Sequence, residues 1–447
     1  MITNSPASLG HSSAIIPEEI PGSHHPFEHD SRWQVMSKNL RGAIQALVTY
    51  RANRRRVKRG DYNLRPLIAS YYVTHRCNLK CLYCTEHYPI RDTVDLDTEG
   101  AFAVLKRLRR EMSAIYFTGG EPLVRPDIVK ILREARRLRF FPIHLGTNGL
   151  LLPLREEVLD YADRLIISLD SMNAASWDDL LNAGPGQARR IYEIIAHYAG
   201  QQRRRRVSIM VNCVITGDTI AEAYRVMEFC FRHDVVFAPV SATTDSLPDR
   251  NLLARADYQR LVRHVVELKR RGYPILGSME SIETLLLGRP FPCYATAIPH
   301  VYPNGDVFYP CQPLGRIGGN LLELGSVEAV YRAGERKFGA WKECWRGCAL
   351  NCYVLSAFYM HHFWDQMVLE SVAQFAMQPG TGKRLPADAA LEPLYEDPAS
   401  WEPTYSISPP PGAASYDVPL AQLSPAGYQR PVREALLAGG FPEGPTP

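Results

Sequence analysis

Six short runs rich in β-branched and aromatic residues alternate with helical patterns between Leu67 and Arg271, and this alternation constrains the fold most strongly. Strands separated by helices of this length favour a parallel sheet of right-handed βαβ units. We therefore predict an α/β fold whose chemistry lies in the loops after the carboxyl ends of the strands. The predicted strands are Leu67–Thr74, Ala114–Thr118, Pro142–Thr147, Leu165–Leu169, Val207–Val214 and Val235–Val240. The predicted helices are Thr98–Met112, Asp127–Leu138, Leu154–Tyr161, Ala188–Gly200, Ile220–His233 and Tyr258–Lys269.

The rest of the chain divides by composition. Residues 1–32 are rich in Ser, Pro and His without periodicity, and we expect them to be disordered. Residues 33–66 are expected to form an amphipathic helix and a basic linker, and 67–275 the catalytic core. Residues 276–377 carry half of the cysteines and are expected to form a small domain of their own. The Pro-rich tail, 378–447, is expected to be extended or disordered.

Charge and cysteine content narrow the function. The net charge of +4, from 51 basic and 47 acidic residues, is too close to balance to predict nucleic-acid binding by the whole chain. No signal-like start is visible, and no apolar segment reaches the roughly 20 residues needed to cross a bilayer. We therefore expect a cytoplasmic protein. Thiols stay reduced in that compartment, so the ten cysteines favour metal ligation over disulfides.

Three cysteines, Cys77, Cys81 and Cys84, follow the first predicted strand in a CxxxCxxC loop. A cluster of four irons needs four ligands, which are usually cysteine thiolates. Three cysteines therefore leave one iron open to a small molecule, as a catalytic cluster requires. The alternatives are buried structural thiols or a zinc site completed by His75 or His87.

A second motif, Gly119-Gly120-Glu121-Pro122, follows the second predicted strand. Two glycines allow the backbone to approach a ligand closely, and a carbonyl-rich turn followed by a carboxylate suits a bound ammonium group. Taken alone, the motif is also typical of an ordinary strand-to-helix turn with Pro near the helix start. Its position one βα unit after the cysteine loop favours the ligand-binding interpretation.

Together these motifs resemble the radical S-adenosylmethionine (SAM) superfamily over Leu67–Val240. The resemblance implies a partial (β/α)6 TIM-type barrel, a [4Fe-4S] cluster on the three cysteines and SAM on the open iron. It places Tyr83 beside the adenine and the turn Gly119, Gly120, Glu121 and Pro122 at the SAM ammonium. It also implies contacts to the SAM carboxylate and ribose from Thr147, Asn148, Ser168 and Asp170, although Ser168 and Asp170 equally suit capping or turns. Relatives often carry an Arg near the segment that corresponds to Leu181–Gly186, and this chain has none there.

The later cysteines resemble the SPASM or twitch extensions of the same superfamily, which bind auxiliary iron–sulfur clusters. Asn304-Gly305 lies between two apolar runs and predicts a β-hairpin that presents the next cysteine. A full SPASM domain has seven cysteines and two clusters. Five thiols favour one fully ligated auxiliary [4Fe-4S] cluster with a spare cysteine, ahead of two clusters with an incomplete ligand set, and ahead of zinc or no metal. The five are Cys293, Cys311, Cys344, Cys348 and Cys352.

The resemblance implies reductive cleavage of SAM to a 5′-deoxyadenosyl radical, hydrogen abstraction from a substrate carbon, and an electron donor such as flavodoxin or ferredoxin. The extension favours a peptide or protein substrate. The helix at 33–60, whose apolar residues recur at helical spacing before a basic run, points instead to a lipid or other hydrophobic metabolite and to peripheral contact with an anionic membrane. Packing of that helix on its own domain is the alternative. A non-enzymatic iron–sulfur electron carrier is disfavoured, because a carrier has no use for the SAM-binding turn.

Overall fold

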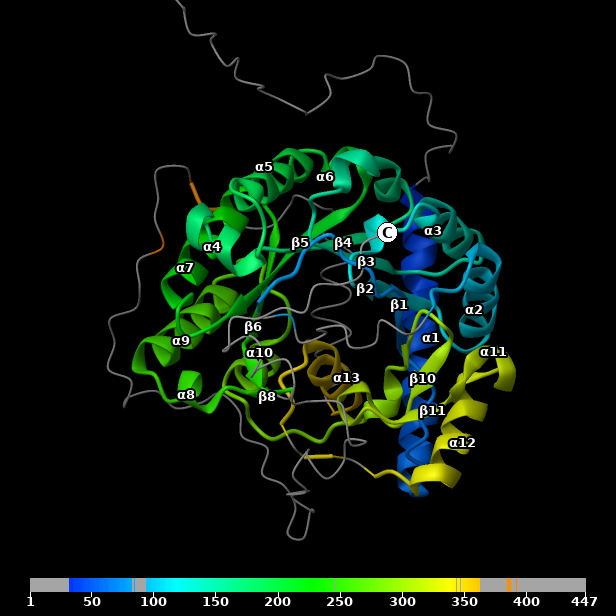
Figure 1. Ribbon diagram of the computed structural model, residues 1–447. Coiled ribbons are helices and arrows are strands. Elements are labelled where there is room, and N and C mark those ends of the chain that lie inside the picture. The colour runs from blue at the N-terminus through cyan, green and yellow to red at the C-terminus, as the bar shows by residue number, and fades with distance from the viewer. Residues whose placement is uncertain are drawn as a thin grey trace, which may run out of the picture.

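Six parallel strands form the centre of the molecule, as the computed structural model shows (Figure 1). The structure describes residues 32–82, 84, 94–244, 246–342, 344–345, 347–361, 384–386 and 391. The strands lie side by side in chain order, and their helices cover the outer face, which gives the partial (β/α)6 barrel that the alternating pattern predicts. The strands are β1 (Ile68–Thr74), β2 (Ala114–Gly119), β3 (Ile143–Thr147), β4 (Arg164–Ser168), β5 (Ser208–Ile215) and β6 (Val236–Ser241).

Alternation along each strand separates the core from the barrel interior. Tyr71, Phe117 and Leu165 point outward and are fully buried in one large apolar cluster with the helices. The longer covering helices each turn an apolar stripe to this cluster. They are α2 (Thr98–Glu111), α3 (Ile128–Arg137), α5 (Gln187–Ala199), α7 (Ile220–Arg232) and α9 (Ala256–Arg270), with the short α6 (Gln202–Arg205) and α8 (Arg250–Leu253) between them.

Two connections differ from the prediction. The helix expected at Leu154–Tyr161 is wrong, because the chain forms two 3₁₀ turns there, η3 (Leu152–Leu154) and η4 (Glu156–Asp160). Pro153 at the start of η3 interrupts the hydrogen bonding of a longer helix. Between β4 and α5 the structure adds α4 (Ala174–Leu181), which the sequence pattern did not predict. A further 3₁₀ turn, η2 (Pro122–Val124), follows β2.

The cysteine-rich region continues the same sheet. Strand β9 (His300–Val301) pairs parallel with β1, with His300 opposite Ser70. The predicted hairpin is confirmed, since β10 (Asp306–Phe308) turns back on β9 and β11 (Ile317–Asn320) closes the edge of a nine-stranded sheet. The domain boundary expected at residue 275 therefore falls between two segments whose strands belong to the same sheet.

The remaining elements surround this extension. Helix α13 lies on the inner side of the sheet, between α10 and strands β10 and β11 (Figure 1). A small two-stranded sheet lies near β6 in the chain. These elements are β7 (Thr243–Thr244), β8 (Leu247–Pro248), α10 (Met279–Leu286), η5 (Ala295–Ala297), η6 (Gln312–Leu314), α11 (Leu321–Leu324), α12 (Val327–Phe338) and α13 (Asn351–His361).

The N-terminal helix α1 (Arg32–Lys58) includes most of the basic run that was expected to be a linker. Its C-terminal end packs on its own chain. Asn53 is fully buried and exchanges two hydrogen bonds with the backbone of Arg65, at 2.8 and 3.0 Å. Val57 packs beside Leu64 in a small apolar cluster. Among the described helices, none has a stretch long and apolar enough to span a membrane.

Part of the tail contacts the barrel. Leu385 is buried, and its N–H donates to the carbonyl of Phe231 on α7 at 3.3 Å. The Leu391 N–H donates to the Glu228 carboxylate of the same helix at 2.6 Å. These described residues are held against α7 rather than extended in solvent. The segment expected to be disordered, 1–32, lies outside the described residues except for Arg32.

Candidate functional site

The Gly-Gly turn after β2 lies against the end of β1. The Gly120 N–H donates to the Thr74 carbonyl at 2.9 Å, and the Glu121 N–H donates to the Arg76 carbonyl at 2.8 Å. A Cβ atom on Gly119 would lie 2.2 Å from the Thr74 oxygen, and one on Gly120 would lie 2.2 Å from the Arg76 oxygen. The two glycines thus bring the turn into backbone contact with the residue that precedes Cys77, so the two motifs form one structural unit.

Glu121 joins this unit to the end of β3. Its carboxylate is fully buried and accepts hydrogen bonds from the Leu123 N–H, the Thr147 hydroxyl and the Asn148 N–H, at 2.9, 2.8 and 2.6 Å. Burial raises the pKa of Glu121 to about 7, against the lowering effect of these donors. The side chain therefore has a positioning job within the protein, and its contact with a SAM ammonium stays a prediction.

The other predicted strand-end residues converge on the same edge. The Asn148 side-chain amide donates to the Asn78 side chain in the cysteine loop at 2.8 Å. Asp170 is buried after β4 and accepts from the Val214 N–H at 2.7 Å, while Ser168 pairs across the sheet with Asn212. Pro122 begins η2 directly after the turn. Tyr83 lies outside the described residues.

The first three cysteines lie half-buried in the loop after β1. The Leu79 N–H points at the Cys77 sulfur, 3.4 Å away. The pKa of Cys77 is raised to about 11 and that of Cys81 to about 12, chiefly by burial, with a smaller contribution from the neighbouring Cys84. None of the ten cysteines, all described, forms a disulfide. Three clustered sulfur donors beside a turn cleared of side chains fit an iron–sulfur cluster with one open iron.

Within the described residues, no three His, Cys, Asp or Glu side chains stand in a metal-binding arrangement. Metal ligation needs the thiolate form of each cysteine.

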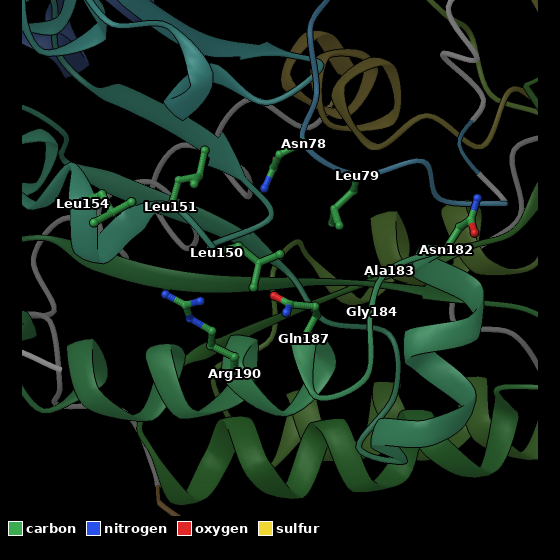
Figure 2. A pocket seen from close by; sticks show the side chains of 10 residues that line it. All are labelled: Asn78, Leu79, Leu150, Leu151, Leu154, Asn182, Ala183, Gly184, Gln187 and Arg190. Carbon is green, nitrogen blue, oxygen red and sulfur yellow. The ribbon is translucent and has the colours of Figure 1, made fainter. Parts of the chain in front are cut away.

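A cavity of about 400 Å³ opens beside the cysteine loop (Figure 2). Its volume lies in the range of small-molecule sites. One wall is formed by residues of the cysteine loop after β1, and a second by apolar side chains after β3. A third wall is formed by the loop and helix after α4, which follow β4, so the ends of three strands contribute. The lining residues are Asn78, Leu79, Leu150, Leu151, Leu154, Asn182, Ala183, Gly184, Gln187 and Arg190.

Arg190 is a site residue that sequence reasoning missed. No Arg stands in Leu181–Gly186, but Arg190 lies one turn into the helix that follows and lines the cavity beside Gln187 (Figure 2). Among the described residues, no acidic side chain pairs with its guanidinium. The only sequence signal was the i, i+3 spacing of Gln187 and Arg190 at the start of α5, which places both on one helix face.

The five later cysteines also gather, in a cluster that we call the late-cysteine cluster. Cys293 and Cys344 exchange backbone hydrogen bonds of 2.7 and 3.1 Å as an isolated antiparallel bridge. Burial raises the pKa of Cys293, and so do the four other thiols of the cluster. The apolar residues packed around the cluster come mostly from α13, with Leu285 of α10 and with Phe291, Ala295 and Ala349 from the segments between elements and from η5. The members are Cys293, Cys311, Cys344, Cys348 and Cys352.

One thiol of this cluster faces the barrel. Cys352, in the first turn of α13, has its sulfur 4.0 Å from Nε2 of His300 on β9. Nδ1 of His300 lies 3.1 Å from the Tyr353 hydroxyl, which accepts from the Gln312 N–H at 3.1 Å. Gln312 follows Cys311, so this chain of contacts ties two cysteines to the strand beside β1. The number of clusters that the five thiols hold stays a prediction.

Comparisons with known proteins agree with this geometry. Residues 71–230 match the family model described as the Radical SAM superfamily. The chain is similar to a probable GTP 3′,8-cyclase of Methanothermobacter marburgensis, with 29% identity over 43% of this chain and 63% of that protein. It is also similar to the PqqA peptide cyclase of Gluconobacter oxydans, with 35% identity over 27% of this chain and 34% of that one. The matched segments thus cover less than two thirds of these relatives.

Among solved structures, the fold is similar to the crystal structure of Streptococcus suis SuiB. The TM-score is 0.50 at 17% sequence identity, and the match covers 66% of this chain and 76% of that one. The match extends beyond residues 71–230 and supports the fold as a whole.

Proposed function

We propose, from the match of residues 71–230 to the Radical SAM superfamily model, that the chain cleaves SAM reductively and modifies a peptide or protein substrate. The observation that most supports this proposal is the backbone contact between the cysteine loop after β1 and the Gly-Gly turn after β2. An electron carrier has no use for the adjacent cavity of about 400 Å³. That cavity favours an enzyme.

Cys77, Cys81 and Cys84 would hold a [4Fe-4S] cluster, with SAM on the remaining iron. When bound, this pair supplies a 5′-deoxyadenosyl radical and methionine from SAM and one electron, and the radical takes a hydrogen atom from a substrate carbon. The protein's own residues position the reactants. Glu121 fixes the turn after β2 against the end of β3, and Asn148 fixes the cysteine loop.

The cavity residues suit the remainder of SAM. Leu150, Leu151 and Leu154 offer an apolar wall, and the Arg190 guanidinium supplies a cation for a carboxylate. The Asn78 and Gln187 amides add hydrogen-bonding groups to the same cavity. With SAM bound there, these side chains would exclude water from one side of the reacting centre and so protect a radical from side reactions.

Two observations support a peptide substrate. A relative that shares 35% identity over part of the chain is named a PqqA peptide cyclase. The late-cysteine cluster is joined to the barrel through β9, so a second metal site would lie on the sheet that carries the reaction. An auxiliary cluster there would accept the electron that a substrate radical loses when it is oxidised to the product.

A nucleotide substrate is the second candidate, because another relative, at 29% identity, is named a probable GTP 3′,8-cyclase. A lipid substrate, suggested by the amphipathic helix, ranks below these two, because Val57 and Asn53 hold the C-terminal part of α1 against the protein.

The proposal is tested with anaerobically reconstituted protein, dithionite and SAM, by measuring 5′-deoxyadenosine with mass spectrometry. Wild-type protein should form it. The Cys77→Ala/Cys81→Ala/Cys84→Ala variant should form none and should lose about four irons per chain. Cys230→Ala is the matched control, because this buried thiol of α7 lies outside both cysteine sites and should leave the product unchanged.

Zinc in place of iron in wild-type protein, or equal product from the triple variant, would contradict the proposal. The substrate class is then tested by adding GTP or a random peptide library to the same reaction. Faster formation of 5′-deoxyadenosine with peptides, and a mass change in some of them, is the expected result. Stimulation by GTP alone would favour the nucleotide candidate.

A further inference from the structure

The C-terminal half of α1 presents cations on an exposed side. Ile44, Val48, Arg51, Arg55 and Lys58 recur at intervals of three and four residues, so they share one side of the helix. All are exposed, and so are Arg54 and Arg59. No acidic side chain in the described part of the chain pairs with any of these cations. We call this set the basic face: Arg51, Arg54, Arg55, Lys58 and Arg59.

The basic face is fixed rigidly to the rest of the molecule. The side chain next to it, Arg56, pairs with Glu328 of α12 at 2.9 Å. Just beyond the helix, Asp61 pairs with Arg332 at 2.9 Å, and the Asn63 amide donates to Glu335 at 2.8 Å. These three contacts hold the end of α1 and the residues after it against α12, whereas a solvated basic segment needs none.

From the basic face the chain leads directly to the late-cysteine cluster. The ring of Tyr62 stacks on Tyr294 with centroids 6.3 Å apart and planes 10° apart. Tyr294 is buried and follows Cys293 in the chain. The Leu64 N–H donates to the Thr296 hydroxyl at 3.2 Å, which fixes the same two segments side by side. The segment that follows the basic face thus packs on the residue next to a candidate cluster ligand, Cys293.

We propose that the basic face is the docking surface for an acidic redox protein that delivers single electrons to this chain. The inference rests on the proposed function, because SAM cleavage consumes one electron. That electron leaves the partner, whose one-electron centre is oxidised, and reduces SAM, whose S–C5′ bond breaks to give methionine and the 5′-deoxyadenosyl radical. A patch of unpaired cations speeds the encounter with an acidic partner and orients it.

The composition of this side of α1 favours a protein partner over a membrane. An interfacial helix buries a continuous apolar face that includes aromatic residues. From residue 44 onward, the part of α1 whose side chains the structure describes, the large exposed apolar residues are Ile44 and Val48, which precede the cations along the helix. Tyr50 and Val57 of the same half pack against the protein.

The test compares wild-type holoenzyme with the variant Arg51→Glu/Arg55→Glu/Lys58→Glu. The probe is an acidic flavodoxin, and its dissociation constant is measured by calorimetry at about 50 and about 300 mM NaCl. Wild-type binding should weaken with salt, and the variant should bind roughly tenfold more weakly at low salt. Arg203→Glu/Arg204→Glu/Arg206→Glu carries the same charge change on α6 and the residue after it, and should bind like wild type.

A second measurement separates docking from the chemistry. SAM cleavage by the α1 variant should match wild type when dithionite supplies the electrons, and should fall roughly tenfold when reduced flavodoxin supplies them. No cleavage by wild-type protein with dithionite would mean that the proposed function itself has failed. Equal flavodoxin binding by wild type and the α1 variant would overturn the docking proposal alone.

The membrane is tested in the same set of proteins. If wild-type protein sediments with phosphatidylserine vesicles and the α1 variant does not, while flavodoxin binding is equal in both, the basic face serves a membrane and the proposal is wrong. If neither wild-type protein nor the α1 variant binds vesicles, and the α1 variant binds flavodoxin more weakly than wild type, the docking proposal is supported.

Discussion

At the scale of single residues, the site depends on a close contact between two backbone segments, which is possible because glycines without side chains stand at the point of contact. Gly120 leaves room for the carbonyl of Arg76, and the contact places the turn after β2 beside Cys77. The expectation that these glycines let a ligand approach was incomplete. They first let one strand end approach another, and this contact shapes the ligand site.

Gly120→Ala should therefore destabilise the protein by about 3 kcal/mol, because the new methyl group would collide with backbone that has no flexible end to yield. The free energy of unfolding of cluster-free protein, measured with urea, checks this. Gly217→Ala is the control, since its methyl group meets only an Arg255 side chain at 3.5 Å. Similar losses in both variants would contradict the close-contact argument.

Glu121 gives a prediction about pH. Its pKa is raised in the folded protein to about 7, above the value of 4.5 for an exposed Glu. A raised folded-state pKa means that the folded protein binds the proton more tightly, so this contribution to stability is full below about pH 4.5 and is lost as the pH rises through about 7.

Melting temperatures of cluster-free protein between about pH 5 and pH 8 measure this contribution. Glu121→Gln should flatten the slope, because glutamine does not titrate. It should also lower stability by about 1–3 kcal/mol, because its amide cannot accept from all three donors of the wild-type carboxylate. An unchanged slope would show that the Glu121 proton is not linked to folding.

At the scale of elements, the strand pattern predicted β1 to β6 to within two residues at each end. Period-two burial and the intervening helical stripes are local signals, so sequence alone carries them. The predictions of secondary structure and domain boundaries were wrong where local sequence signals were weak or where long-range contacts determine the structure. The 3₁₀ turns around Pro153 depend on a single residue, and the pairing of His300 with Ser70 joins segments far apart in the chain.

The same distinction applies to the site. The five later cysteines are spread over residues 293–352 and were singled out through a resemblance, whereas Gly119 to Glu121 and the CxxxCxxC loop were predictable from short motifs. Arg190 was not, since its place in the cavity depends on where α5 begins relative to the cysteine loop. The job of Glu121 was also hidden, because its partners Thr147 and Asn148 belong to the next strand.

Helix α1 offers a test at this scale. Asn53→Ala removes both side-chain partners of the Arg65 backbone in a fully buried position, and should lower the free energy of unfolding by about 1–3 kcal/mol. Gln45→Ala, on the half-exposed part of the same helix, should change it by less than about 0.5 kcal/mol. If α1 were a detached membrane helix, both variants would unfold like wild type.

At the scale of the whole molecule, two cysteine sets share one sheet without sharing residues. The first lies after β1, and the second is assembled around the segment that leads into β9 and around α13. Their independence has a measurable consequence. The variant without Cys77, Cys81 and Cys84 should still hold iron, at about four atoms per chain for one auxiliary cluster.

Iron analysis and electron paramagnetic resonance of the reduced variant check this, with Cys293→Ala/Cys344→Ala added to the triple variant as the comparison. The combined variant should lose the remaining iron and its spectrum, while Cys213→Ala added to the same triple variant should keep both. An iron-free but folded triple variant would rule out an auxiliary iron–sulfur site.

The pairing of β9 with β1 also has a consequence for how the chain is made. On the ribosome, β1 is finished early and gains β2 as a neighbour, but its other edge stays without a partner until His300 has been translated. An open strand edge recruits other chains, and sequence-distant pairing is slow. Nascent chains stopped before β9 should therefore associate with holdase chaperones, and those that extend past β11 should be released from them.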